Sequence, residues 1–168
     1  MSTETLHQVP PTSTTPPPAV VAFLDGADLE NKVGTAVGVL TADEDSWPHH
    51  AQLSAGEVLL AHDGAVALLL HDGSATTGNL RRDGRITLVL AAGGANHEMR
   101  FQVAEQPVET DLPLAAFTGH LRVAREHKVP YAEITSGVTY RLHDPVSVVS
   151  RWERQVALLR GLLTSQEN

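Results

Sequence analysis

The sequence predicts a mainly β fold, a closed or partly closed antiparallel barrel with helices around it. Short apolar stretches with the alternation or β-branched content of strands recur along the chain. Short turns separate most of them, and such turns join antiparallel neighbours but cannot cross over a parallel sheet. About six or seven strands with three or four peripheral helices suit such a barrel.

Most of the predicted strands form hairpins. The clearest hairpin signal is His62-Asp63-Gly64, because Asp-Gly favours the tight turn between two strands. Gly93 and Gly94 mark another turn, and Asp144-Pro145 interrupts the last pair of strands. The predicted strands are residues 35–41 with 50–54, 57–61 with 65–70, 85–91 with 98–106, and finally 137–143 and 146–150.

The predicted helices lie at the two ends of the chain and between the hairpins. Asp111 is a suitable N-cap for a helix over residues 112–127, with Pro113 in its first turn. Gly34 ends the first helix. The other predicted helices are residues 19–31, a short one over 76–82, and 151–163, which has Trp152, Val156, Leu159 and Leu163 in one stripe.

Composition limits the function classes. The 168 residues include 12 Lys and Arg against 20 Asp and Glu, so a net charge of −8 argues against general binding to nucleic acid or anionic membranes. The absence of Cys excludes disulfides, thiolate metal sites and a Cys nucleophile. No signal peptide or membrane-spanning run is recognisable, so a cytoplasmic protein is expected. Residues 1–18 are predicted to be a disordered Pro/Ser/Thr-rich tail, and residues 19–164 one folded domain.

The run from Gly73 to Arg82, GSATTGNLRR, is the strongest candidate for a binding site. The hydroxyls of Ser74, Thr76 and Thr77 accompany free N–H groups where a helix should begin, an arrangement that suits a phosphate. The same hydroxyls also cap a helix without any ligand. Both interpretations stay open from the residues alone.

In chain order, the elements of residues 19–155 resemble the pyridoxamine 5′-phosphate oxidase-like family of FMN-binding split β-barrels. The resemblance is to the family and not to the true oxidase. It rests on the opening helix, the strand from Val33 to Thr41, the turn Ser46-Trp47-Pro48-His49, and the segment from Asn79 to Arg85. The last of these is the most specific.

This resemblance implies a split β-barrel with Greek-key-like connections and a homodimer that binds FMN at the subunit interface. The flavin ring would lie along the second strand, where backbone groups would orient it, and the phosphate would meet the loop before the short helix. Trp152 would either stack near the flavin edge or anchor the last helix. The implied cofactor-binding residues are Gln52, Leu53, Ser54, Ser74, Thr76, Thr77, Asn79, Arg81 and Trp152.

The loop departs from the family pattern, which has Arg or Lys where this chain has Ser74 and Thr76. Charge-assisted hydrogen bonds to phosphate are roughly twice as strong as neutral ones. Arg81, Arg82 or Arg85 could supply the missing charge.

The sequence does not support metal binding, vitamin B6 oxidation or serine hydrolysis. The nine histidines lack metal-binding spacing, because adjacent His49 and His50 point to opposite faces of a strand, so no metal site is predicted. The segment Arg141-Leu142-His143 resembles the substrate-binding segment of the true oxidases, but Pro145 and a predicted strand follow it, and vitamin B6 oxidation is not predicted. A Gly-x-Ser-x-Gly motif is absent.

The sequence therefore predicts an FMN-binding protein and, if it is an enzyme, a flavin-dependent oxidoreductase. It identifies neither catalytic residues nor the small-molecule substrate. Two alternatives remain on the same fold: a deazaflavin-dependent reductase, and a cofactor-free or haem-related binding module without redox turnover.

Overall fold

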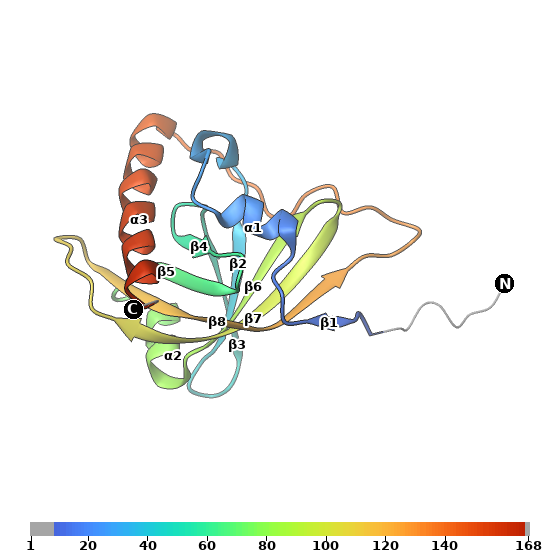
Figure 1. Ribbon diagram of the computed structural model, residues 1–168, viewed down its shortest axis with the longest axis horizontal. Coiled ribbons are helices and arrows are strands. Elements are labelled where there is room, and N and C mark those ends of the chain that lie inside the picture. Colours follow the sequence, from blue (N-terminus) through green and yellow to red (C-terminus); the bar gives the residue numbers. More distant parts are fainter. Residues whose placement is uncertain (1–8, 167–168) are drawn as a thin grey trace.

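A computed structural model describes residues 9–166 and shows a curved antiparallel sheet that forms a half-barrel (Figure 1). The strand order is β3-β2-β6-β7-β8-β5-β4, and the short β1 pairs with β8. The predicted mainly β split-barrel fold is confirmed. The strands are β1 (Thr12–Ser13), β2 (Val37–Ala42), β3 (Pro48–Leu53), β4 (Val58–Leu60), β5 (Ala65–His71), β6 (Arg85–Ala92), β7 (Ala95–Gln106) and β8 (Leu114–His127).

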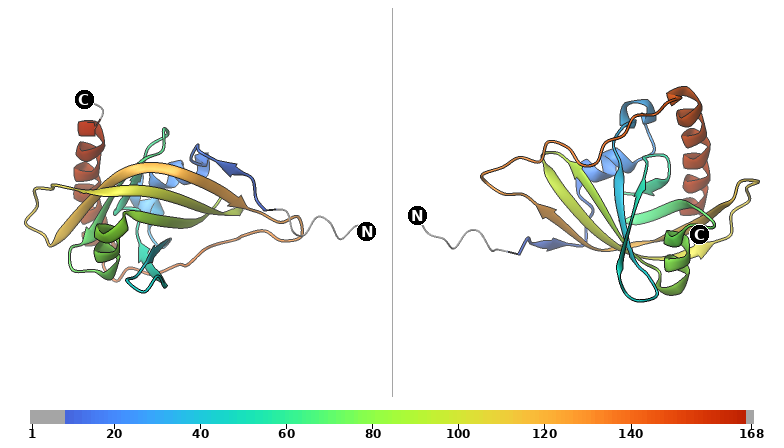
Figure 2. Two further views of the ribbon diagram at one scale, coloured as in Figure 1. Left: turned by 90° about the horizontal axis from the view of Figure 1, so that it is seen from below. Right: turned by 180° about the vertical axis from the view of Figure 1, so that it is seen from behind.

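Four helical segments accompany the sheet, and they lie at its ends and sides (Figure 2). They are α1 (Pro18–Leu24), the 3-10 helix η2 (Leu29–Lys32), α2 (Ala75–Asp83) and α3 (Pro145–Gln166). The single helix predicted over residues 19–31 is divided, because Gly26 and Asp28 adopt positive φ angles of 74° and 51°. None of the helices among residues 9–166 is both long enough and apolar enough to span a membrane.

The three predicted hairpins β2–β3, β4–β5 and β6–β7 are present. Their turns use the chemistry that the sequence indicates. Gly64 has a φ of +91°, and Gly93 and Gly94 have φ angles of +59° and +78°, a region that favours glycine. Local turn residues therefore determine these pairings.

The helix predicted over residues 112–127 is wrong, because this segment forms strand β8 between β5 and β7. The first half of β8 shows no alternation of apolar and polar residues, because both faces of the strand are buried there. Ala115 and Phe117 face the barrel interior, whereas Ala116 packs under α3. Pairing with two strands outweighs the helical propensity of an alanine-containing segment.

The strand predicted over residues 146–150 is also wrong, because these residues form the first turns of α3. The carboxylate of Asp144 accepts a hydrogen bond from the N–H of Ser147 at 3.2 Å, and Pro145 occupies the first helical position. The pair that looked like a strand break is thus an N-cap followed by proline. In the predicted strand 137–143, only Thr139 forms a β-bridge, with Thr35.

Part of the predicted disordered tail takes part in the fold. Thr12 and Ser13 pair with Arg125 and Ala124 of β8. Residues 1–8 of that tail lie outside the described part of the chain. The prediction of disorder over the whole of 1–18 therefore does not hold for the residues of β1.

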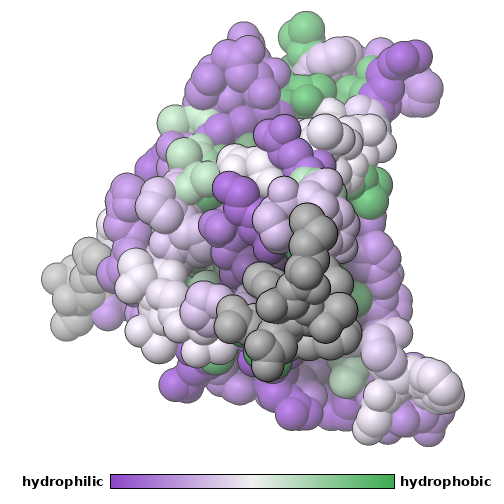
Figure 3. Space-filling model, turned by 90° about the vertical axis from the view of Figure 1, so that its right-hand side faces the viewer, coloured by the Kyte–Doolittle hydropathy of each residue, from purple (hydrophilic) through white to green (hydrophobic). Residues whose placement is uncertain are grey.

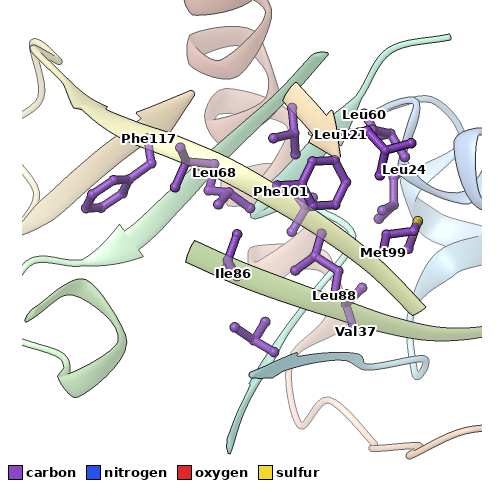
Figure 4. Packing of buried hydrophobic residues seen from close by; sticks show 14 of the residues in the cluster. Leu24, Val37, Leu60, Leu68, Ile86, Leu88, Met99, Phe101, Phe117 and Leu121 are labelled. Atoms are coloured by element: carbon purple, nitrogen blue, oxygen red, sulfur yellow. The ribbon is translucent and has the colours of Figure 1, made fainter. Parts of the chain in front are cut away.

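The hydrophobic core has two parts, separated by strand β5. Large apolar side chains from both walls of the barrel meet inside it, among them Leu68, Leu88, Met99 and Phe101 (Figure 4). On the other side of β5, α3 packs against the sheet through a second cluster. Each fully buried side chain of this size contributes about 1.5–3 kcal/mol. The second cluster includes Leu59, Ala67, Leu69, Ala116, Trp152, Val156 and Leu159.

The surface on the side of the N-terminal end is largely hydrophilic (Figure 3). Hydrophobic side chains gather there toward the end of the molecule where α3 begins. Val146, at the start of α3, is 83% exposed.

Candidate functional site

The outer face of β3, β2, β6 and β7 carries a continuous row of half-exposed side chains. Residues of these strands alternate between the barrel interior and this outer face. The strand register aligns them in rows across the sheet. One row contains Gln52, Gly38, Val89 and Glu98, and the next contains His50, Leu40, Thr87 and Arg100.

Two adjoining cavities lie on this face, and Leu40 lines both of them. We refer to the two together as the outer groove. The first cavity, of about 510 Å³, lies over the middle of β2 and β6 and is mostly apolar. The second, of about 440 Å³, lies over the end of β6 and reaches β7 and β8.

The floor of the first cavity is open at Gly38. Gly38 has no side chain, and a Cβ atom there would lie 3.5 Å from Val89 Cβ and 3.5 Å from His50 Nε2. The ring nitrogen Nε2 of His50 lies 3.1 Å from the amide nitrogen of Gln52, so these two side chains form a polar rim on β3. A flat apolar ring with polar atoms at one edge fits such a surface.

The second cavity is lined by three arginines, Arg85, Arg100 and Arg122. Arg85 pairs with Asp83 at 2.9 Å, and Arg100 pairs with Glu98 at 2.9 Å. Among residues 9–166, no ion pair includes Arg122. This cavity therefore offers positive charge in a chain whose net charge is −8.

Two hydroxyls of the predicted phosphate loop, those of Ser74 and Thr77, have partners within the chain. Ser74 is the N-cap of α2, and its Oγ accepts a hydrogen bond from the N–H of Thr77 at 3.1 Å. Ser74 Oγ also donates to Thr77 Oγ1, which itself donates to the carbonyl of His71 at 2.8 Å. Thr76 and Thr77 are 4% and 0% exposed. This geometry matches the capping interpretation of the loop.

An acidic turn also faces the start of α2. Asp43, Glu44 and Asp45 line one cavity of about 420 Å³ together with Arg82 and other residues of the helix. Asn79, which also lines it, donates a hydrogen bond to Thr41 Oγ1 at 2.9 Å and so fastens α2 to β2. Three carboxylates near this helix end disfavour a phosphate on that side.

Arg81 forms ion pairs with two carboxylates. Its guanidinium bonds to Glu105 and Asp72, each at 2.6 Å. The hydrogen bonds to Glu105 and Asp72 raise the pKa of Arg81 above its ordinary value. Arg82 donates to Asn79 Oδ1 at 3.1 Å and to the carbonyl of Ala42. These arginines therefore connect α2 to neighbouring elements.

The remaining predicted residues lie in different surroundings. Gln52 lines the outer groove, but the Leu53 side chain packs against the barrel core. The N–H and Oγ of Ser54 both donate to Glu57, at 2.7 and 2.8 Å. Trp152 is 2% exposed and packs so closely on Gly56 that a Cβ there would lie 2.1 Å from its ring. Trp152 is thus buried in the cluster that anchors α3, which matches the anchoring alternative of its prediction.

The structure thus brings Gln52 to the groove and places the loop residues and Trp152 elsewhere. Sequence reasoning missed Gly38, Leu40, Arg100 and Arg122. The alternation of β7 could have placed Arg100 on the outer face, whereas the helix predicted over β8 concealed Arg122. Among the described residues, no group of three or more His, Asp or Glu side chains has the geometry of a metal site.

Comparisons with known proteins agree with the fold. No family model matches the chain. The uncharacterized protein YclD of Bacillus subtilis is 31% identical over 140 residues, which cover 82% of this chain and 91% of YclD. The crystal structure titled "putative pyridoxamine 5′-phosphate oxidase" from Lactobacillus delbrueckii aligns with a TM-score of 0.53 at 12% identity, over 67% of this chain and 94% of the other. An FMN-binding protein from Syntrophomonas wolfei gives a TM-score of 0.48 at 13% identity, over 64% of this chain and 88% of the other.

Proposed function

We propose that this protein, which belongs to the same family as YclD and has the pyridoxamine 5′-phosphate oxidase-like split-barrel fold, binds a flavin nucleotide in the outer groove. The observation that carries the proposal is the juxtaposition of the two cavities. An apolar floor at Gly38 and Val89 adjoins a cavity lined by arginines. A flavin nucleotide combines a planar ring with an anionic end, so one face can accept both parts.

The ring would lie over Gly38, Leu40 and Val89, where apolar contacts exclude water. The polar rim of His50 and Gln52 would face one edge of the ring. β3 lies at the end of the sheet order, so one side of its backbone has no sheet partner among residues 9–166 and can hydrogen-bond to ring atoms. This agrees with the backbone contacts predicted near residues 52–54.

When bound, a flavin supplies hydride or electron transfer, and the protein contributes orientation and a dry environment. The side chains of the groove are suited to these two tasks. His50 and Gln52 provide polar atoms on the rim of the first cavity, where they can orient the edge of the ring. We propose FMN as the cofactor and a flavin-dependent redox reaction as the activity.

The proposal is tested by titrating the purified protein with FMN and following flavin fluorescence and the visible absorption bands. Gly38→Leu should weaken FMN binding about tenfold or more, because the added side chain fills the floor of the groove. Gly161→Leu is the matched control, since a Cβ atom at Gly161 meets nothing within 4 Å.

Wild-type protein that binds no FMN would refute the proposal, as would Gly38→Leu protein with unchanged affinity. A parallel titration with a deazaflavin coenzyme identifies the cofactor class. Tighter binding of the deazaflavin would assign the groove to that coenzyme instead of FMN.

A further inference from the structure

We infer that the phosphate of the ligand binds to Arg85, Arg100 and Arg122, and not at the start of α2. The inference rests on the proposed function, because the phosphate is that of the flavin nucleotide placed in the outer groove. The arginines occupy three adjacent strands, β6, β7 and β8 (Figure 1). Arg85 pairs with Gln102, two residues from Arg100, and all three arginines line one cavity, so one phosphate group can meet more than one of these side chains.

A β-bulge places Arg122 in this cluster. Arg100 pairs with Val123 and Phe101 pairs with Leu121, so Arg122 is the extra residue on β8. In a regular strand, residues three apart would point to opposite faces, yet Leu121 and Ala124 both face the barrel core. The bulge thereby turns Arg122 to the outer face, beside Arg100.

The cluster retains free hydrogen-bond donors. A guanidinium has five N–H donors, and Arg85 and Arg100 each form an ion pair with a single carboxylate. Arg122 takes part in no ion pair among residues 9–166. Guanidinium groups bind phosphate oxygens in a bidentate manner, which gives both strength and orientation. Thr87 and Gln102 line the same cavity and add neutral polar groups.

The position of the cluster relative to the apolar floor suits a nucleotide. Val89 lies at the floor, and Arg85 is four residues away along the same strand. This separation is about 13 Å at the rise of a β-strand, which leaves room for a ribityl chain along Leu40 and Thr87. At the start of α2, in contrast, the hydroxyls of Ser74 and Thr77 already have partners, Thr76 is only 4% exposed, and an acidic turn lies against the helix.

The test compares FMN with riboflavin, which lacks the phosphate, in four proteins: wild type, Arg122→Gln, Thr76→Val and Arg151→Gln. Arg151 is an exposed arginine of α3 and is the matched control. Wild type should bind FMN more tightly than riboflavin. Arg122→Gln should reduce that preference about tenfold or more, because a charge-assisted hydrogen bond is lost, while riboflavin affinity stays unchanged. The other two variants should retain the preference.

A preference for FMN that survives Arg122→Gln but is lost in Thr76→Val would overturn the inference and return the phosphate to α2. If wild type binds neither flavin, the proposed function fails, and inorganic phosphate then tests the site alone. Thermal stabilisation by phosphate that Arg122→Gln abolishes would support the arginine cluster as an anion site. Equal stabilisation of both proteins, or none of either, would overturn it.

Discussion

Individual side chains of α2 that the sequence predicted to contact a cofactor form hydrogen bonds to distant strands instead. Asn79 bonds to Thr41 of β2, and Arg81 bonds to Glu105 of β7. Both side chains hold a short helix against strands far away in the chain. The contacts of Asn79 and Arg81 therefore belong to the fold, whereas Arg85, at the end of the same segment, lines the outer groove.

The Arg81–Glu105 pair gives a prediction about pH. The hydrogen bond from Arg81 lowers the pKa of Glu105. A carboxylate with a lowered folded-state pKa adds stability above its unfolded pKa, and this contribution is lost as the pH falls through the folded value. Arg81→Gln should therefore lower the Tm at pH 7, and the difference from wild type should shrink below about pH 4. Calorimetry at both pH values checks this, with Arg151→Gln as control. An equally large difference at low pH would show that the ion pair is not the cause.

At the scale of elements, the local residue pattern did not decide between helix and strand in β8 and at the start of α3, and contacts with neighbouring segments did. In β8, the inward side chains Leu121 and Ala124 are three residues apart because of the bulge, a spacing typical of a helix. At the start of α3, a β-branched run reads as strand, but the preceding Asp144-Pro145 pair begins a helix.

The N-cap of α3 can be tested directly. Asp144→Ala should reduce the free energy of unfolding by about 1 kcal/mol, because the N–H of Ser147 loses its acceptor. Asp144→Asn should retain most of the stability, since an amide oxygen also caps helices well. Urea denaturation measures both variants. Equal losses in the two would mean that the carboxylate charge, and not capping, matters at this position.

At the scale of the whole molecule, the outer groove is open on one side, and we expect a second copy of the chain to cover it. Leu40 and Val89 lie half-buried on this face, and an apolar surface of this kind is typical of an interface. A specific dimer would bury about 800 Å² on each partner.

Leu40→Lys should therefore convert a dimer to a monomer and weaken FMN binding as well, because a charge would enter the covered face. Val146→Lys is the control, since Val146 is 83% exposed and lies on α3 away from the groove. Light scattering coupled to size-exclusion chromatography measures the mass. A wild-type monomer, or a dimer that tolerates Leu40→Lys, would contradict this interface.

The sequence by itself determined three hairpins, because turns such as Asp63-Gly64 and Gly93-Gly94 act over a few residues. It also identified the split-barrel family through the segment at Asn79. Only the tertiary structure decided that residues 114–127 form a strand, since burial on both faces and a bulge remove the local period. It alone brought Arg85, Arg100 and Arg122 together, because the register between three strands depends on contacts far apart in the chain. The candidate site is formed by residues that only the register between distant strands brings together. For this reason the sequence predicted the fold better than it predicted the site.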